Sequence, residues 1–145
     1  MVDASKGDYD MRLYGTYTPA EWDEKTIEVI EDRMKLTRVT AEFTFEGDIE
    51  AIAKVEYLMF YSSFDPEDMH KAKAQYIGQI RIIGRLQGKL GSFVVNDVGS
   101  FIGGVANSEL SIIAGSGTGE LIGINGVGEY AADEKGCTWE MEVSL

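Results

Sequence analysis

Two carboxylates that interrupt apolar runs are the residues best suited to chemistry in this 145-residue chain. Glu56 lies in the otherwise apolar stretch Lys54 to Tyr61, where it shares a strand face with Leu58 and Phe60. A carboxylate that points into a protein interior is desolvated, so its pKa rises, and it can act as a general base or anchor a ligand. The alternative is that this face points outward, or toward a neighbour that supplies Arg81 or Lys54 to pair with Glu56.

Asp97, in the segment SFVVNDVGSF, is the second such carboxylate. By strand alternation it shares a phase with the apolar residues Phe93, Val95 and Phe101. Either Asp97 interrupts the inner face of a strand, near an open end, or a β-bulge beside Asn96 shifts the register there.

Three tyrosines in strand-like segments, Tyr57, Tyr61 and Tyr76, could line a ligand cavity and offer phenol hydroxyls. They could equally be ordinary core aromatics. The predicted ligand-binding set is therefore Glu56, Tyr57, Tyr61, Tyr76 and Asp97, and Glu56 is the single catalytic candidate.

The chain has one histidine and one cysteine, which excludes several other chemistries. An intramolecular disulfide is impossible, and a Cys/His metal cage would need more ligands. A Ser-His-Asp triad could only use His70, which lies in a charged, loop-like segment. Cys137 is expected to be an inert thiol at the start of the last strand. We therefore expect no metal and no cofactor.

The charge balance is strongly acidic, with 13 basic against 25 acidic residues and a net charge of −12. Phosphate backbones and anionic membrane surfaces would be repelled, so neither nucleic acid nor membrane is an expected partner. The first residues, MVDASKGDYD, lack the apolar region of a signal peptide. The longest apolar stretch, around residues 57–61, is far shorter than a bilayer span. These features predict a soluble cytoplasmic protein.

Alternation with a period of two recurs in at least four segments, typical of antiparallel strands. The alternating sets are Met11, Leu13, Gly15 and Tyr17; Ala41, Phe43 and Phe45; Tyr76, Gly78, Ile80 and Ile82; and Trp139, Met141 and Val143. Segment 21–33 is expected to be mostly strand or loop, and segment 65–73 to hold one helical turn. About eight strands without a long helix favour a closed barrel. We predict a disordered segment over residues 1–10 and one β-barrel domain over 11–145.

A glycine-rich segment, GSGTGELIGINGVG over residues 115–128, has no following lysine for a phosphate loop and no room for a βαβ unit. A turn, a short strand and another turn are expected instead. The segment resembles the repeated-glycine hairpin of allene oxide cyclase-like barrels, shared in looser form with plant dirigent proteins.

The whole chain more closely resembles a bacterial family of small barrel proteins known only as a domain of unknown function. The matching pieces follow one another in order: Gly15-Thr16 with Trp22 and Glu24; residues 45–50; residues 56–59; residues 76–78 with Arg81; Gly84, Leu86 and Gly88; residues 91–93; and residues 115–128. The resemblance implies an antiparallel, self-associating, allene oxide cyclase-like barrel of about eight strands. Ile80 stands where the family is expected to carry an acid before Arg81, so cyclase activity does not transfer by analogy.

The function predicted from these features is binding of a small, largely apolar organic molecule inside the barrel, oriented by Glu56 and a tyrosine. One alternative is a cofactor-independent cyclase or isomerase with Glu56 as base. Another is a structural or interaction protein whose barrel is filled by its own side chains. Segments 54–61 and 108–114 are apolar in both phases, which is typical of strands that lie inside a layered structure or against another subunit. We therefore expect a homo-oligomer.

Overall fold

The computed structural model describes residues 9–145, which form nine strands and one short 3-10 helix. The predicted disorder of the first ten residues falls almost wholly outside this range. The strands are β1 (Met11–Glu31), β2 (Met34–Gly47), β3 (Ile49–Ser63), β4 (Lys73–Leu86), β5 (Lys89–Ile102), β6 (Val105–Ile112), β7 (Thr118–Gly119), β8 (Asn125–Asp133) and β9 (Gly136–Ser144). The helix, η1 (Met69–Lys71), supplies the helical turn predicted between β3 and β4.

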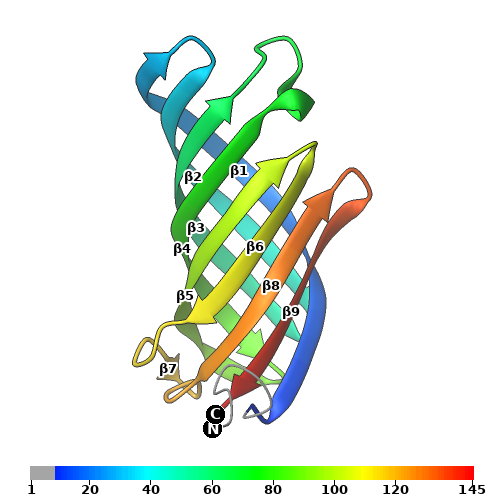
Figure 1. The fold of residues 1–145 in the computed structure, drawn as a ribbon. Helices are drawn as coiled ribbons and strands as arrows, with labels where there is room; N and C mark the ends of the chain where they lie inside the picture. The colour runs from blue at the N-terminus through cyan, green and yellow to red at the C-terminus, as the bar shows by residue number, and fades with distance from the viewer. Residues whose placement is uncertain (1–8) are drawn as a thin grey trace, which may run out of the picture.

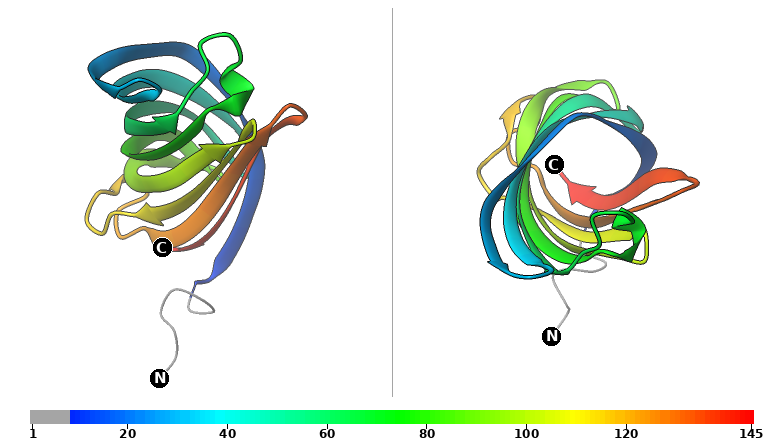
Figure 2. Two further views of the ribbon diagram at one scale, coloured as in Figure 1. Left: turned by 45° about the horizontal axis from the view of Figure 1, so that its top comes forward. Right: turned by 90° about the horizontal axis from the view of Figure 1, so that it is seen from above.

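All strand pairings among the described residues are antiparallel, and the sheet closes on itself. The hydrogen-bonded order is β4-β3-β2-β1-β9-β8-β6-β5, and an additional pairing of β5 with β4 completes the ring. β7 pairs only with the start of β5, outside this ring. Figure 1 shows the strands crossing obliquely, and Figure 2 shows them winding around a central axis. The prediction of an all-β, antiparallel fold with about eight main strands is confirmed.

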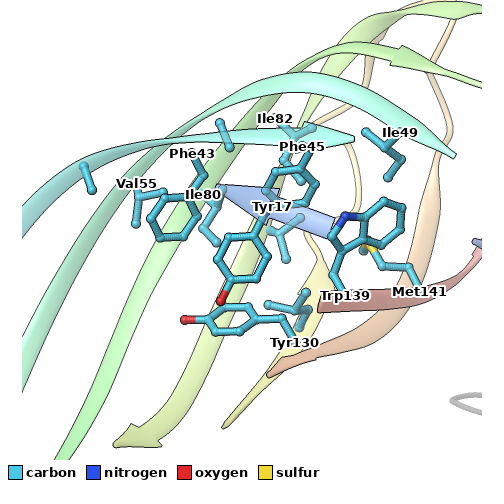
Figure 3. Packing of buried hydrophobic residues seen from close by; sticks show 14 of the residues in the cluster. Tyr17, Phe43, Phe45, Ile49, Val55, Ile80, Ile82, Tyr130, Trp139 and Met141 are labelled. Carbon is cyan, nitrogen blue, oxygen red and sulfur yellow. The ribbon is translucent and has the colours of Figure 1, made fainter. Parts of the chain in front are cut away.

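The alternating segments place their apolar residues inside the ring. The side chains of Leu13, Phe43, Ile80 and Met141 are buried, whereas their sequence neighbours Arg12, Glu42, Arg81 and Glu142 lie on the outer face or its margin. Figure 3 shows how the interior residues from different strands meet, with the rings of Phe45 and Trp139 stacked at a centroid distance of 5.6 Å.

The glycine-rich segment lies at one end of the ring, which we call the packed end, where it pairs with β5 beyond the last residue of β6. A turn at residues 114–115, the short strand β7 and a turn at residues 120–123 follow one another here, so the predicted turn, strand and turn are found. Leu121 and Ile124 from these turns are almost fully buried. Backbone hydrogen bonds from Ile113 to Val94 and from Glu120 to Leu90 fix the segment against β5.

The opposite end, which we call the open end, carries the turns that join β1 to β2, β3 to β4, β5 to β6 and β8 to β9. Segment 21–33 belongs largely to β1 here, so the strand prediction for it is confirmed. A β-bulge interrupts the pairing of β1 with β2 between Ala20 and Asp23, and Glu21 adopts a positive φ of 51° there. Because the bulge adds one residue, it reverses which side chains of β1 face inward.

Candidate ligand-binding cavity

An internal cavity of about 260 Å³ occupies the half of the ring nearest the open end. Its walls are almost entirely apolar and aromatic: Tyr17, Pro19, Trp22, Phe43, Tyr57, Met59, Tyr61, Met69, Tyr76, Phe101, Ala106, Tyr130 and Ala132. Trp22 and Met69 are 48% and 44% exposed, so the cavity reaches solvent where these two side chains lie. A cavity of this size and character suits a small organic molecule.

A chain of buried hydroxyl groups crosses one wall of this cavity. The Tyr57 hydroxyl donates to Asp97 Oδ2 at 2.6 Å and lies 2.8 Å from the Tyr130 hydroxyl. Tyr130 in turn donates to the Tyr76 hydroxyl at 3.2 Å, and Tyr76 lies 2.7 Å from Ser108 Oγ. The order Asp97, Tyr57, Tyr130, Tyr76, Ser108 therefore joins residues from five different strands.

Asp97 is fully buried at one end of this chain and does not itself line the cavity. Its Oδ1 atom has no hydrogen-bond partner within residues 9–145. Burial raises the pKa of Asp97 to about 6, although the hydrogen bond from Tyr57 acts in the opposite direction. A carboxyl group in this position changes its charge close to neutral pH.

The phenols that line the cavity stay protonated in the physiological range. Burial raises the pKa of Tyr57 and of Tyr130 well above the ordinary value, and the nearby Asp97 carboxylate adds to both effects. The pKa of Tyr17 is raised in the same way, by burial first and then by the neighbouring Cys137 thiol. The cavity therefore presents neutral hydroxyls rather than phenolates.

Two glycines make the hydroxyl chain sterically possible. Gly78 on β4 lies in register between Tyr57 on β3 and Asp97 on β5. A Cβ at Gly78 would lie 2.5 Å from the Tyr57 ring, so the absence of a side chain lets this ring cross β4 and reach Asp97.

The same order of tyrosine, glycine and polar residue recurs one strand further on, displaced by two residues along the strands. Gly99 lies in register between Tyr76 and Ser108, and a Cβ there would lie 2.6 Å from the Tyr76 hydroxyl. Each of these two tyrosines thus passes over a glycine on the neighbouring strand and reaches a polar side chain two strands away.

The bulge in β1 positions the residues at the cavity mouth. Between this bulge and the next register shift, which follows Thr26, the even-numbered residues face inward, so Trp22 tilts toward Tyr57 with ring centroids 6.4 Å apart. Glu24 accepts hydrogen bonds from the Trp22 indole at 3.1 Å, from Tyr61 at 2.5 Å and from Thr37 at 2.8 Å. Without the bulge, the charged residues Glu21 and Asp23 would face the cavity instead.

The predicted site residues divide into three groups. Tyr57, Tyr61 and Tyr76 all line the cavity. Asp97 lies on the inner face, as the first of its two interpretations required. β5 pairs with β4 without any register shift, so the predicted alternative of a bulge beside Asn96 is wrong.

Glu56 does not belong to the site. Its side chain is exposed on the outer face of β3, in register with Thr40 and Gln79. The period-two alternation puts Val55 and Tyr57 inside, which forces Glu56 outward, and the outward-facing alternative is the one observed. The prediction that Glu56 lies in the interior and acts as a base or ligand anchor is therefore wrong.

Sequence reasoning missed Tyr17, Trp22 and Tyr130 as cavity residues. Tyr17 and Tyr130 stand at inward positions of alternating strands, so their alternation could have indicated them. Trp22 could not be found in this way, because only the bulge turns it inward.

Other chemistry receives no support from the described part of the chain. No cluster of three or more histidine, cysteine, aspartate or glutamate side chains able to hold a metal occurs in residues 9–145. His70 is exposed on η1 and lies 3.9 Å from Glu134, as expected for a solvated loop residue. No helix in the described range is long and apolar enough to cross a membrane.

The protein is thus an all-β protein with a closed antiparallel sheet around a phenol-lined cavity. Residues 13–143 match the family described as "Protein of unknown function (DUF3224)", and the chain belongs to this family. Its structure is similar to the crystal structure of a DUF3224-family protein of unknown function from Shewanella oneidensis MR-1, with a TM-score of 0.73 and 22% sequence identity. That similarity covers 93% of this chain and 96% of the other and concerns the fold. A comparison with curated proteins finds no match.

Proposed function

We propose that the ring is an allene oxide cyclase-like β-barrel that binds a small, neutral, largely apolar organic molecule in its interior. The observation that carries the proposal is the apolar 260 Å³ cavity with a hydroxyl chain on one wall. Apolar walls with a few placed polar groups are typical of small-molecule sites. The walls would supply affinity, and the hydroxyl chain would orient the ligand.

The charge of the site favours a neutral ligand over an anion. Asp97 carries a negative charge above its pKa of about 6, immediately behind Tyr57 and close to Tyr130. A carboxylate ligand beside these phenols would meet that charge in a medium of low dielectric constant. No basic side chain among the described cavity residues offsets it.

The hydrogen bonds further specify a ligand that donates. Tyr57 gives its only proton to Asp97, and the single proton of Tyr130 goes either to Tyr57 or to Tyr76. The Tyr130 hydroxyl therefore has no proton left for a ligand and can only accept a hydrogen bond from it. An alcohol, phenol or N–H group of a ligand can donate to the Tyr130 oxygen.

Binding is favoured over the alternative of a cyclase or isomerase. Acid–base catalysis requires a group of suitable pKa within reach of the substrate. Within residues 9–145, the side chains that line the cavity include no carboxylate and no histidine, and Glu56, the predicted base, lies outside. The alternative of a filled barrel is disfavoured by the cavity itself.

The experiment that tests the proposal is a fluorescence titration with N-phenyl-1-naphthylamine, a neutral probe that brightens in apolar surroundings. Ala132 lines the cavity, whereas its neighbour Ala131 is exposed on the outer face of β8. Ala132→Trp is expected to abolish saturable binding by filling the cavity. Ala131→Trp, on the same strand, is the matched control and should bind as the wild type does.

Equal binding by both variants would place the probe on the outer surface and overturn the proposal. No saturable binding by the wild-type protein would also overturn it. Circular dichroism and thermal unfolding of each variant establish that a loss of binding comes from a filled cavity rather than from an unfolded chain.

A further inference from the structure

A row of exposed apolar side chains crosses the outer face of the ring. Leu58 on β3, Ile77 on β4 and Val98 on β5 are paired in register, and they are 41%, 56% and 55% exposed. Contiguous exposed apolar side chains on neighbouring strands mark an interaction surface more often than isolated ones do. An open groove of about 970 Å³ follows this row and continues toward β6, β8 and β9.

The same row carries opposite charges at its two ends. Arg38 on β2 pairs in register with Leu58, and Glu109 on β6 pairs in register with Val98. Glu129 and Glu140 extend the acidic end onto β8 and β9. Arg38 and Glu109 are exposed, and neither forms an ion pair with another residue of the range 9–145.

This pattern is symmetric about Ile77. Leu58 and Val98 are each one strand away from it, and Arg38 and Glu109 are each two strands away, on opposite sides. A two-fold axis that lies in the interface above Ile77, parallel to the strands, would place Ile77 against its own copy and Leu58 against Val98. It would also bring Arg38 of each copy opposite Glu109 of the other, twice in one interface.

The neighbouring rows are compatible with this pairing. Around the same axis, each neighbouring row would face itself with its ends exchanged, so Glu56 would meet Asn96 and Phe60 would meet Ser100. Gln79 and Gln75 would each meet their own copies, so no two like charges face each other in these rows. An isologous interface requires such self-complementarity.

We infer that this row is the interface of a homodimer, and that its occupant is a second copy of this chain. The inference is independent of the ligand proposed for the interior, because it uses only outward-facing residues. A different basic or acidic partner would match one end of the row but not both, whereas a second copy matches both ends at once.

The test is the mass of the wild-type protein in solution, measured by sedimentation equilibrium over a range of concentrations. Ile77→Glu sets two carboxylates against each other at the axis and is expected to raise the dimer dissociation constant by about 100-fold or more. Ile122→Glu is the control, because Ile122 is 72% exposed near the packed end and away from the row. It should leave the mass unchanged.

A charge exchange distinguishes a second copy from other occupants. Arg38→Glu alone should weaken the dimer by about 10-fold or more, since two acidic ends then meet. Adding Glu109→Arg to the same chain should restore the dimer, because each altered end again faces its opposite.

Three results would overturn the inference. A wild-type protein that is still monomeric at about 100 µM would leave the row to another partner. A dimer that persists unchanged in Ile77→Glu would use another face. A double variant that stays as weak as Arg38→Glu would show that the two charges do not meet.

Discussion

The two halves of the interior share one fold but are filled differently. At the packed end, Phe93, Leu86, Ile49, Trp139 and Leu121 meet with little exposed surface and no buried carboxylate among them. At the open end, aromatic rings surround a cavity, and buried polar side chains gather beside it. The packed half is filled by apolar side chains, whereas the open half leaves a cavity.

Glycine serves different purposes in the two halves. At the packed end, a Cβ on Gly15 would lie 2.5 Å from the Trp139 ring, so this glycine admits an apolar side chain. At the open end, Gly78 and Gly99 admit tyrosines whose hydroxyls reach polar partners across the strand. The same steric allowance thus supports core packing in one half and a hydrogen-bond chain in the other.

The largest difference expected between the halves is in stability. Phe93→Ala removes a fully buried ring from the packed end and should lower the free energy of unfolding by about 3–5 kcal/mol. Phe101→Ala should cost less than half of that, because Phe101 is only half-buried and already borders the cavity. Urea denaturation of both variants checks the comparison. Equal losses would mean that the open half is packed as tightly as the other.

The next effect concerns the pH dependence that Asp97 introduces. Its folded-state pKa of about 6 lies above the ordinary value of 3.8, so the folded protein binds this proton more tightly than the unfolded chain. The contribution to stability therefore falls as pH rises from about 4 to about 6, by up to about 3 kcal/mol.

Asp97→Asn removes this contribution. The difference in unfolding free energy, wild type minus variant, should decrease between pH 4 and 6 and become constant above about pH 7. Urea denaturation across this range measures it. A difference that does not change with pH would contradict the raised pKa, and subtraction of the variant cancels the titration of the other carboxylates.

A smaller effect tests the glycine that the hydroxyl chain requires. A Cβ at Gly99 would lie 2.4 Å from the Asn107 carbonyl oxygen, 2.5 Å from Ser108 Oγ and 2.6 Å from the Tyr76 hydroxyl. Gly99→Ala should therefore cost about 1–3 kcal/mol through overpacking. Adding Tyr76→Phe should recover part of that loss, because the hydroxyl that clashes is gone. A double-mutant cycle measures the coupling. Additive costs would separate Gly99 from the tyrosine.

The fold was largely predictable from the sequence because alternation reports which face of a strand is buried. The alternating apolar residues Leu13, Phe43, Ile80 and Met141 are all buried in the structure. Alternation does not predict that Trp22 and Glu24 face inward, because a β-bulge exchanges the two faces of β1 before them. The bulge has Glu21 at positive φ and no glycine, so the sequence does not indicate it.

The site was predictable only in part. Three of its tyrosines follow from alternation, but Glu56 was assigned to the interior because of its apolar neighbours. Those neighbours, Leu58 among them, belong to the exposed row on the outer face, so an apolar run can mark a surface as well as a core. The reach of Tyr57 to Asp97 depends on three strands lying in register, which a single sequence does not give.

The most direct measurement for the central claim compares 2-naphthol with naphthalene as competitors of the bound fluorescent probe. The two molecules share an apolar body, and only 2-naphthol can donate a hydrogen bond to the Tyr130 oxygen. Wild-type protein should prefer 2-naphthol by about 5-fold, in keeping with one net hydrogen bond. Tyr130→Phe should remove the preference while naphthalene binds as before. Equal affinities in the wild type, or a preference that survives Tyr130→Phe, would contradict a cavity oriented by its hydroxyl chain.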